Sequence, residues 1–347
     1  MRVVDLFCGL GGMTCGALEA GAEVVLAVDS DPVPLKILGA NAPHTTTVVA
    51  TLGEGCDAVS LPPAAPDLHV HLSTPCTELS VARRCTNADT TGGGLEMIRW
   101  AVHYVLGRND CSWSLENVPT KATRALMAEL VAAHPERVAY GVFDSADFGA
   151  PQNRLRLIAG PPRLIRMLQG IPCARRVSVR DAFSRAGEEL PAGYCKNQTR
   201  SQSGGPTMRT VETQSFTVCA GHALTWCDAE GSTVRVMTAR DSATLMGFPS
   251  TWALPKGSRA AQRAVGNAVC VALSKAIVLA AVAVQKGEAS VPCEAVTAPA
   301  SPSPAPTKTP RALEVTYKQY RRLRRRVGDL ERTACFLDQH TDRVLED

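Results

Sequence analysis

The chain has 347 residues, of which 45% are hydrophobic, and a formal net charge of +4. This length suits one large domain or two moderate ones, and the charge is too small to establish a polyanionic partner. No stretch approaches the roughly 20 uninterrupted apolar residues of a membrane-spanning helix, and the N-terminus has no signal-peptide pattern. We therefore expect no membrane partner and a location in the cytoplasm or nucleus.

The 13 cysteines are scattered along the chain and odd in number. Without an export signal, this pattern favours reduced thiols over a disulfide framework. No pair has the CxxC spacing of a zinc site, so we expect no metal.

Over residues 1–160, short apolar runs typical of strands alternate with longer helical patterns. The expected strands are 3–7, 23–29, 45–50, 67–73, 111–116, 137–143 and 154–160. The expected helices are 13–20, 31–40, 94–107 and 121–133. This alternation predicts an α/β fold with a mainly parallel sheet, helices on both faces, and ligands beyond the carboxyl ends of the strands.

The alternation of strand and helix patterns stops after the first half of the chain. Residues 163–233 are rich in polar loop residues and predict a smaller, irregular region. Regular patterns return near Val234, and 267–284 predicts one apolar helix. Residues 287–310 are rich in Pro, Ala, Ser and Thr, which is typical of a flexible linker.

A glycine-rich turn follows the first predicted strand, in Asp5-Leu6-Phe7-Cys8-Gly9-Leu10-Gly11-Gly12. Glycines permit a tight turn and close approach of the backbone to a ligand at the N-terminus of the next helix. Asp29 ends the second strand about 20 residues later, where an acid typically binds ribose hydroxyls. The pattern indicates a nucleoside cofactor: a nicotinamide, a flavin or S-adenosylmethionine.

The fourth predicted strand leads into Pro75-Cys76. This position places a thiol just beyond the carboxyl end of the strand, where the reactive group of a cofactor is expected. A thiolate is a strong nucleophile when nearby positive charge lowers its pKa. Considered alone, a buried cysteine is more often a small structural hydrophobe.

Two further motifs lie at the end of the fifth expected strand and at the start of the seventh. Glu116-Asn117-Val118-Pro119 offers a carboxyl group that can bind the edge of a flipped pyrimidine, or it is only a polar strand end. In Gln152-Asn153-Arg154-Leu155-Arg156, the two arginines are two residues apart and share one face of a strand. They suit an anionic group, or are two solvated residues on an edge strand.

Taken in order, these motifs resemble those of the C5-cytosine-specific DNA methyltransferase family. Asp5 to Gly12 is similar to its cofactor loop, and Pro75-Cys76 to its nucleophile loop. Residues 116–118 are similar to its Glu-Asn-Val motif, and residues 152–156 to its Gln-x-Arg-x-Arg motif. Residues 235–249 are similar to the motif that ends its recognition region, and Gly266–Val269 to its last motif.

The resemblance implies a Rossmann-like S-adenosylmethionine-dependent methyltransferase sheet with a small irregular target-recognition domain. It divides the chain into a catalytic domain over 1–162, completed by 262–285, and a target-recognition region over 163–233. Residues 234–285 hold C-terminal motifs and a helix that packs back on the catalytic domain. A disordered linker over 286–310 and a basic helical tail over 311–347 follow.

The resemblance also implies the reaction, which is transfer of a methyl group from S-adenosylmethionine to C5 of cytosine in DNA. The implied catalytic residues are Cys76, Glu116, Arg154 and Arg156. Cys76 attacks C6, which makes C5 enamine-like, while a protonated Glu116 binds N3 and the amino group. Arg156 contacts the base region, and Arg154 supports the catalytic loop or a phosphate. The target base is flipped out of duplex DNA.

The implied cofactor residues are Phe7, Gly9, Leu10, Gly11, Gly12, Asp29, Pro75, Asn267, Ala268 and Val269. Phe7 packs on the adenine and Asp29 binds the ribose, while Asn267 to Val269 line the opposite wall of the pocket.

The chain departs from the family pattern at several points. Thr74 and Thr77 replace a proline and a glutamine of the nucleophile loop, and Ser30 replaces a larger apolar residue beside Asp29. The acid that meets the adenine amino group is Glu54 or Asp57, and neither fits the pattern well.

The recognition region is short, about residues 165–205. Its candidate phosphate contacts are Arg175, Arg176, Arg180, Lys196 and Arg200, and its candidate base contacts are Asn197 and Gln198. A polar structural insertion is the alternative.

The tail carries the basic run 320–326 on a helix-prone segment. A phosphate anchor, a nuclear-entry signal, a short coiled coil that self-associates and a solvated helix all fit it. We expect a monomeric catalytic unit. The alternatives to a DNA methyltransferase are an RNA (tRNA) cytosine-5 methyltransferase, a catalytically silent nucleic-acid-binding relative and a nicotinamide dehydrogenase.

Overall fold

The computed structural model describes residues 1–291 except 56–58, 76–91, 110, 172–175 and 198–207. The described residues belong to one compact unit, Met1–Pro306. Cys76, Thr77 and Asp57 lie outside the described residues, as do the expected tail and all but the first residues of the expected linker.

A seven-stranded sheet forms the centre of this unit, in the order β3-β2-β1-β4-β5-β7-β6. Its strands are β1 (Arg2–Leu6), β2 (Glu23–Asp29), β3 (Thr46–Val49), β4 (Leu68–Leu72), β5 (Ser112–Asn117), β6 (Ala139–Asp144) and β7 (Leu155–Gly160). β1 to β5 pair in parallel, whereas β7 runs antiparallel to β5 and β6. The predicted mainly parallel sheet is confirmed.

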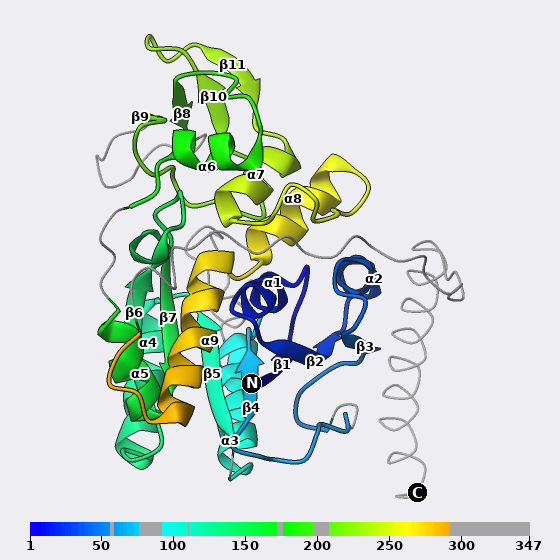
Figure 1. Ribbon diagram of the computed structural model, residues 1–347, viewed down its shortest axis with the longest axis vertical. Coiled ribbons are helices and arrows are strands. Elements are labelled where there is room, and N and C mark those ends of the chain that lie inside the picture. Colours follow the sequence, from blue (N-terminus) through cyan, green and yellow to red (C-terminus); the bar gives the residue numbers. More distant parts are fainter. Residues whose placement is uncertain (56–58, 76–91, 110, 172–175, 198–207, 292–347) are drawn as a thin grey trace, which may run out of the picture. The chain divides into compact units, whose positions relative to one another are not determined.

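Helices cover both faces of the sheet (Figure 1). The helices of one face are α1 (Gly12–Glu19), α2 (Pro32–Asn41), α5 (Pro162–Gln169) and α9 (Val271–Lys286). Those of the other face are α3 (Gly92–Leu106) and α4 (Lys121–Ala133). Because β1 and β4 lie in the middle of this sandwich, all five residues of β4 are buried.

Two glycines let α1 and α9 touch. A Cβ on Gly12 would lie 2.0 Å from the carbonyl oxygen of Val269, and a Cβ on Gly16 would lie 2.5 Å from the Cβ of Ser274. Both distances are far below van der Waals contact, so only glycine allows this packing. α9 therefore packs closely against α1, the helix that follows the glycine-rich turn.

The apolar helix predicted over 267–284 is wrong in its extent. α8 (Ser258–Asn267) ends there, Ala268 is extended at φ −66° and ψ 151°, and α9 starts only at Val271. At this break, the side chain of Arg154 donates to the carbonyls of Gly266 and Ala268, which gives both a partner outside the helices. The segment Ser258–Lys286 is long and apolar enough to cross a membrane, but 72% of its most apolar window is buried in the protein.

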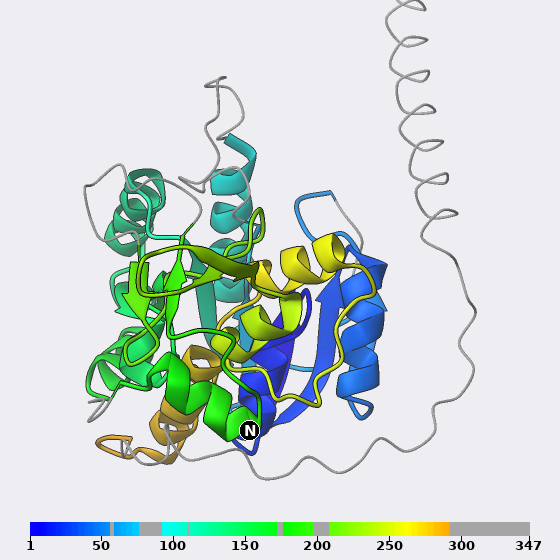
Figure 2. The ribbon, with the colours of Figure 1, turned by 90° about the horizontal axis from the view of Figure 1, so that it is seen from above.

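A second, antiparallel sheet lies above the carboxyl ends of the parallel strands (Figures 1 and 2). Its strands, in the order β11-β10-β8-β9, are β11 (Thr233–Val236), β10 (Thr225–Cys227), β8 (Tyr194–Lys196) and β9 (Met208–Thr210). Two short helices accompany it, α6 (Val179–Ala186) and α7 (Ala239–Met246). Phe183 and Trp226 pack edge to face at 5.3 Å in its core. The region expected to be irregular thus contains its own small sheet.

Candidate active site

The turn between β1 and α1 is open at Gly9. Phe7, Gly9 and Gly11 adopt positive φ angles of 59°, 52° and 86°. A Cβ on Gly9 would meet nothing within 4 Å. α1 begins after Gly11, which has no side chain to cap the helix. The Asp5 carboxyl group instead accepts the N–H and the hydroxyl of Thr14 in the first turn, at 3.0 and 2.7 Å.

Asp29 fixes this turn and keeps capacity for a ligand. Its Oδ2 accepts the backbone N–H of Gly9 at 2.8 Å, and its Oδ1 accepts that of Asp31 at 2.8 Å. Burial raises the pKa of Asp29. Each carboxylate oxygen has a second lone pair, so ribose hydroxyls can still be accepted. The open glycine and this acid fit a nucleoside cofactor.

The other expected cofactor residues differ in placement. Leu10 is fully buried, and its carbonyl accepts the Trp252 indole N–H at 3.3 Å. Gly12 packs against Val269, as described above, and Ala268 is buried beside it. The residues exposed to solvent are Pro75 and Asn267. Glu54, a candidate for the adenine contact, is also exposed.

Asn117 pins the segment that leads to Cys76. Its Nδ2 donates to the Thr74 carbonyl at 3.1 Å and to the Thr74 hydroxyl at 2.9 Å. Its Oδ1 accepts the N–H of Val118 at 2.8 Å. The family's proline would offer no side-chain acceptor at position 74, so the departure at Thr74 adds an anchor. Pro75 is the last described residue before the expected nucleophile.

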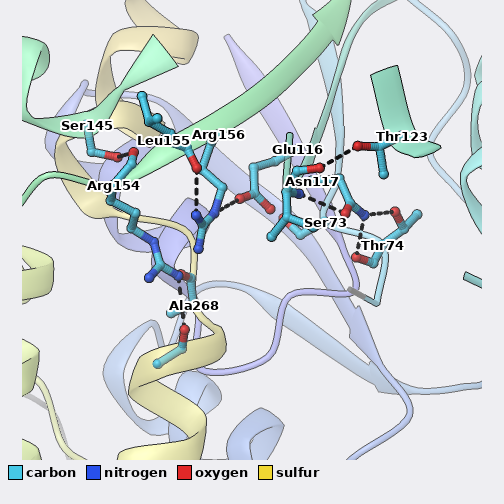
Figure 3. A network of polar contacts seen from close by, with 12 residues as sticks. Ser73, Thr74, Glu116, Asn117, Thr123, Ser145, Arg154, Leu155, Arg156 and Ala268 are labelled. Carbon is cyan, nitrogen blue, oxygen red and sulfur yellow. Dashed lines mark hydrogen bonds and ion pairs between the residues drawn. The ribbon is translucent and has the colours of Figure 1, made fainter. Parts of the chain in front are cut away.

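Glu116 and Arg156 form an ion pair at the end of β5, as Figure 3 shows. Arg156 Nε lies 2.7 Å from Glu116 Oε1, and the two side chains are only 13% and 11% exposed. Arg156 also donates from Nη1 to the carbonyl of Leu155. The antiparallel pairing of β7 with β5 brings the two residues together, because Ile158 lies opposite Glu116. A nearly buried ion pair beside the nucleophile segment can bind a polar, planar ligand edge.

Arg154 is buried in the protein rather than solvated, so the alternative of two solvated arginines is wrong. Its Nη1 donates to the Val218 carbonyl at 2.7 Å, and its Nη2 donates to those of Gly266 and Ala268 at 2.9 and 3.0 Å. Burial, then the charge of Arg156, lowers the pKa of Arg154 to about 10. The guanidinium therefore ties β7 to the turn between α8 and α9.

Gln152 adds to the hydrogen bonds by which Arg154 holds Val218. Its Oε1 accepts the N–H of Val218 at 3.0 Å, and its Nε2 donates to the carbonyl of Leu245 at 2.8 Å. Gln152 and Arg154 thus hold Val218 by both of its backbone groups. Valine carries no chemical signal in a sequence, so sequence reasoning did not find this contact.

The candidate recognition residues that are described bind other parts of the protein. Arg176 pairs with Asp147 at 2.5 Å and Arg180 with Glu212 at 2.6 Å. Lys196 donates to the carbonyl of Gly231. Asn197 lies 3.3 Å from His222 Nε2. The remaining candidates, Arg175, Gln198 and Arg200, lie outside the described residues.

Sequence comparison gives one family for most of the chain. A model described as C-5 cytosine-specific DNA methylase matches residues 1–160 and 169–282. The type II methyltransferase M.NlaX of Neisseria lactamica is 24% identical over 303 residues, covering 80% of this chain and 94% of that protein. M.HindV of Haemophilus influenzae is 23% identical over 309 residues, covering 82% and 98%.

Solved structures share the fold. A protein described as a DNA modification methyltransferase encoded within an E. coli prophage has a TM-score of 0.55 at 16% identity, covering 83% of this chain and 100% of that one. The S. pombe Dnmt2 methyltransferase has a TM-score of 0.52 at 17% identity, covering 83% and 98%. The predicted Rossmann-like methyltransferase sheet is confirmed.

The predicted activity is confirmed by the same family match: DNA (cytosine-5)-methyltransferase, with S-adenosylmethionine as the methyl donor and DNA as the substrate. One family model spans both the large sheet, with the glycine-rich turn after β1, and the segments that return to it. This protein therefore belongs to the C-5 cytosine-specific DNA methylases.

Proposed function

We propose that this methyltransferase acts through a covalent bond between Cys76 and C6 of a cytosine flipped out of duplex DNA. The observation that carries the proposal is the nearly buried pair of Glu116 and Arg156, which lies beside the Thr74 anchor. Thr74 is two residues before Cys76. A nucleophile and a polar edge-binding group on adjacent strands suit attack on a pyrimidine held by its Watson–Crick edge.

The thiolate of Cys76 adds to C6 and breaks the C5=C6 double bond, which makes C5 nucleophilic. S-adenosylmethionine, held by Gly9 and Asp29, supplies an electrophilic methyl group when bound. Loss of the C5 proton then returns an electron pair to the ring, and Cys76 leaves C6 as a thiolate. This sequence restores the double bond and frees the thiol for another turnover.

In the proposal, Glu116 recognises the base and Arg156 orients Glu116. Protonated as N3 approaches, the carboxyl group donates to N3 and accepts from the amino group, so it stabilises the charge that develops there. Arg156 holds the carboxyl group in one orientation through Oε1. Arg154 is a positioning residue, because its three bonds join β7 to the wall formed by 266–268.

The region around the small sheet would read the target sequence, and the basic tail would anchor phosphates or pair with a second copy. A monomer would suffice for catalysis, since Glu116, Arg156 and Asp29 come from one chain. The enzyme would act inside the cell, wherever its DNA substrate is.

Tritiated S-adenosylmethionine tests the substrate: label should enter duplex DNA and not total RNA. Trapping with duplex DNA that contains 5-fluorocytosine tests the covalent step, since fluorine cannot leave C5 as a cation. Wild type should form a stable adduct and Cys76→Ala should not. Cys111→Ala, which removes a thiol just before β5, is the matched control and should still form the adduct. Label only in RNA, or an adduct in Cys76→Ala, would overturn the proposal.

A further inference from the structure

A continuous chain of polar side chains runs along one face of the sheet, over β4 and β5. His69 Nδ1 lies 3.0 Å from Ser112 Oγ, and His69 Nε2 lies 2.8 Å from Ser114 Oγ. Ser114 Oγ also lies 2.8 Å from His71 Nδ1, and His71 Nε2 lies 2.9 Å from Ser73 Oγ. The chain therefore ends at the first residue after β4, on the side of the active site.

The parallel register explains why these groups meet. His69 pairs with Ser112 and His71 with Ser114, so alternate residues of both strands share one face. The next position along this face of β5 is Glu116. Both histidines and Ser114 are fully buried. Central parallel strands are usually continuous apolar runs, so the fold itself does not require this chain.

The buried imidazoles are neutral, because burial lowers the pKa of His69 and of His71 to about 3. A neutral imidazole has one N–H donor and one acceptor nitrogen. Ser114 has one hydroxyl proton and contacts both rings, so if it donates to one ring it must accept from the other. The proton position on each ring is thus coupled to that on its neighbour, and Ser114 orients the His71 ring that binds Ser73.

Ser73 and Thr74 are held from two directions. The His71 ring binds the Ser73 hydroxyl, and Asn117 binds both acceptors of Thr74. The N–H of Ser73 also donates to the carbonyl of Leu6 on β1 at 3.1 Å. Figure 3 shows Ser73 and Thr74 beside Glu116 and Asn117. Only Pro75 separates these anchors from Cys76.

We propose that His71, oriented by the hydrogen-bonded chain of Ser114 and His69, is a positioning residue for methyl transfer. It holds Ser73 and so fixes the point from which the chain continues to Cys76. This inference deepens the proposed function and rests on it.

Two amide variants of His71 separate the two ring contacts. The amide of Gln reaches about as far as Nε2 and keeps the bond to Ser73, whereas the amide of Asn reaches about as far as Nδ1 and keeps only the bond to Ser114. Both replacements are neutral and polar, so they are matched in chemistry. Single-turnover methyl transfer, the KM for S-adenosylmethionine and urea unfolding are measured for both.

The expected result is a split between the two variants. His71→Asn lowers the single-turnover rate by about 10-fold, the size expected for loss of one buried hydrogen bond, with the KM for S-adenosylmethionine unchanged. His71→Gln stays close to wild type. Ser73→Ala lowers the rate as His71→Asn does. The double variant that combines His71→Asn with Ser73→Ala is no slower than either single variant, because each of these proteins lacks the same bond between residues 71 and 73.

Equal rates in the Asn and Gln variants, or a loss of folding without a loss of rate per folded molecule, would overturn the positioning role. Additive losses in the double variant would do the same. The adduct with 5-fluorocytosine in wild type separates the two proposals. If wild type forms it and the Asn and Gln variants match, only the positioning role fails. If wild type forms none, the proposed function fails and the positioning role falls with it.

Discussion

The active-site edge of the large sheet and the region around the small sheet hold their charged side chains in different ways. Where the carboxyl end of β5 meets the amino end of β7, Glu116, Arg154 and Arg156 are buried or nearly so, and Arg154 alone joins three carbonyls. Around the small sheet, Arg176 and Arg180 form single ion pairs whose side chains are about half exposed. The first arrangement fixes geometry, whereas the second leaves its arginines free to exchange a protein partner for a phosphate.

The difference predicts how each region responds to substitution. A buried charge that loses its partner is penalised strongly, because water cannot replace the lost contact. An exposed pair is worth little, because water and salt compete with it. Substitutions of Glu116, Arg154 or Arg156 should therefore change rate or stability. Substitutions of Arg176 or Arg180 should change mainly DNA binding.

The largest effect is expected at the Glu116 and Arg156 pair. Arg156→Met leaves the carboxyl group nearly buried and without the ion pair that orients it, so kcat should fall by roughly 10²–10³-fold, the size seen when an oriented active-site group is lost. Glu116→Gln should cost a similar factor. The double variant should lose no more than the worse single variant, which a double-mutant cycle on kcat measures. Full additivity would show that the two side chains act independently.

Arg154 should matter more for stability than for chemistry. Arg154→Met leaves three buried carbonyls without their donor, and we expect the free energy of unfolding to fall by about 3 kcal/mol, since each unsatisfied group costs about 1–3 kcal/mol in part relieved by relaxation. The KM for S-adenosylmethionine should rise, because the 266–268 wall loses its tie. Urea unfolding and initial rates measure both. Normal stability in Arg154→Met would show that the three hydrogen bonds of Arg154 are dispensable for folding.

Acid should weaken the fold through His69 and His71. Between about pH 3 and pH 6.5 the unfolded chain protonates both rings, while the native state does not, so stability falls as the pH falls through this range. Asp5, which lies opposite His71, acts in the other direction. Burial raises the pKa of Asp5 from 3.8 to about 7, so the native state holds a proton that the unfolded state releases, and this contribution is lost as the pH rises through about 7.

Asp5→Asn removes the contribution of Asp5 to the pH dependence of stability, so comparison with wild type measures that contribution. The variant should lose stability more steeply than wild type as the pH falls from 6.5 to 4, which urea midpoints measured at each pH reveal. Parallel curves for the two proteins would mean that Asp5 ionises in the native state as it does in the unfolded state.

The smallest effect on stability is expected at the exposed pairs. Arg176→Ala and Arg180→Ala should each change the free energy of unfolding by less than about 1 kcal/mol. If either arginine meets a DNA phosphate, its removal should weaken binding and reduce the salt dependence of log Kd by about one unit. Titrations at several salt concentrations measure this slope. A large loss of stability in either variant would break the comparison between the two regions.

The sheet and its helices could be predicted from sequence because apolar periodicity reports them directly. The alternation over residues 1–160 gave every strand of the large sheet and the helices α1 to α4 within a few residues. The break before α9 was missed because Ala268, Val269 and Cys270 carry no breaker signal, and the donor that takes the carbonyls is Arg154, over a hundred residues away in the chain.

The site could be predicted only in part, for a related reason. Motif order identified Glu116, Arg154 and Arg156, but not that Arg154 faces inward. The roles of Glu116 and Arg156 remain predictions, as does that of Cys76, which lies outside the described residues. His69 and His71 stand in a strand-like run, and nothing in their spacing announces the serines that meet them from β5. Contacts made across neighbouring strands depend on register, which a single sequence does not reveal.

The glycine contact between α1 and α9 bears on how the protein is made. The glycine-rich turn after β1 leaves the ribosome well before α9 (Val271–Lys286), the helix that covers α1. Until then, α1 presents its bare glycine face to the surroundings. We therefore expect final assembly of the cofactor pocket to wait for release of the whole domain, and chains truncated before α9 to aggregate during synthesis.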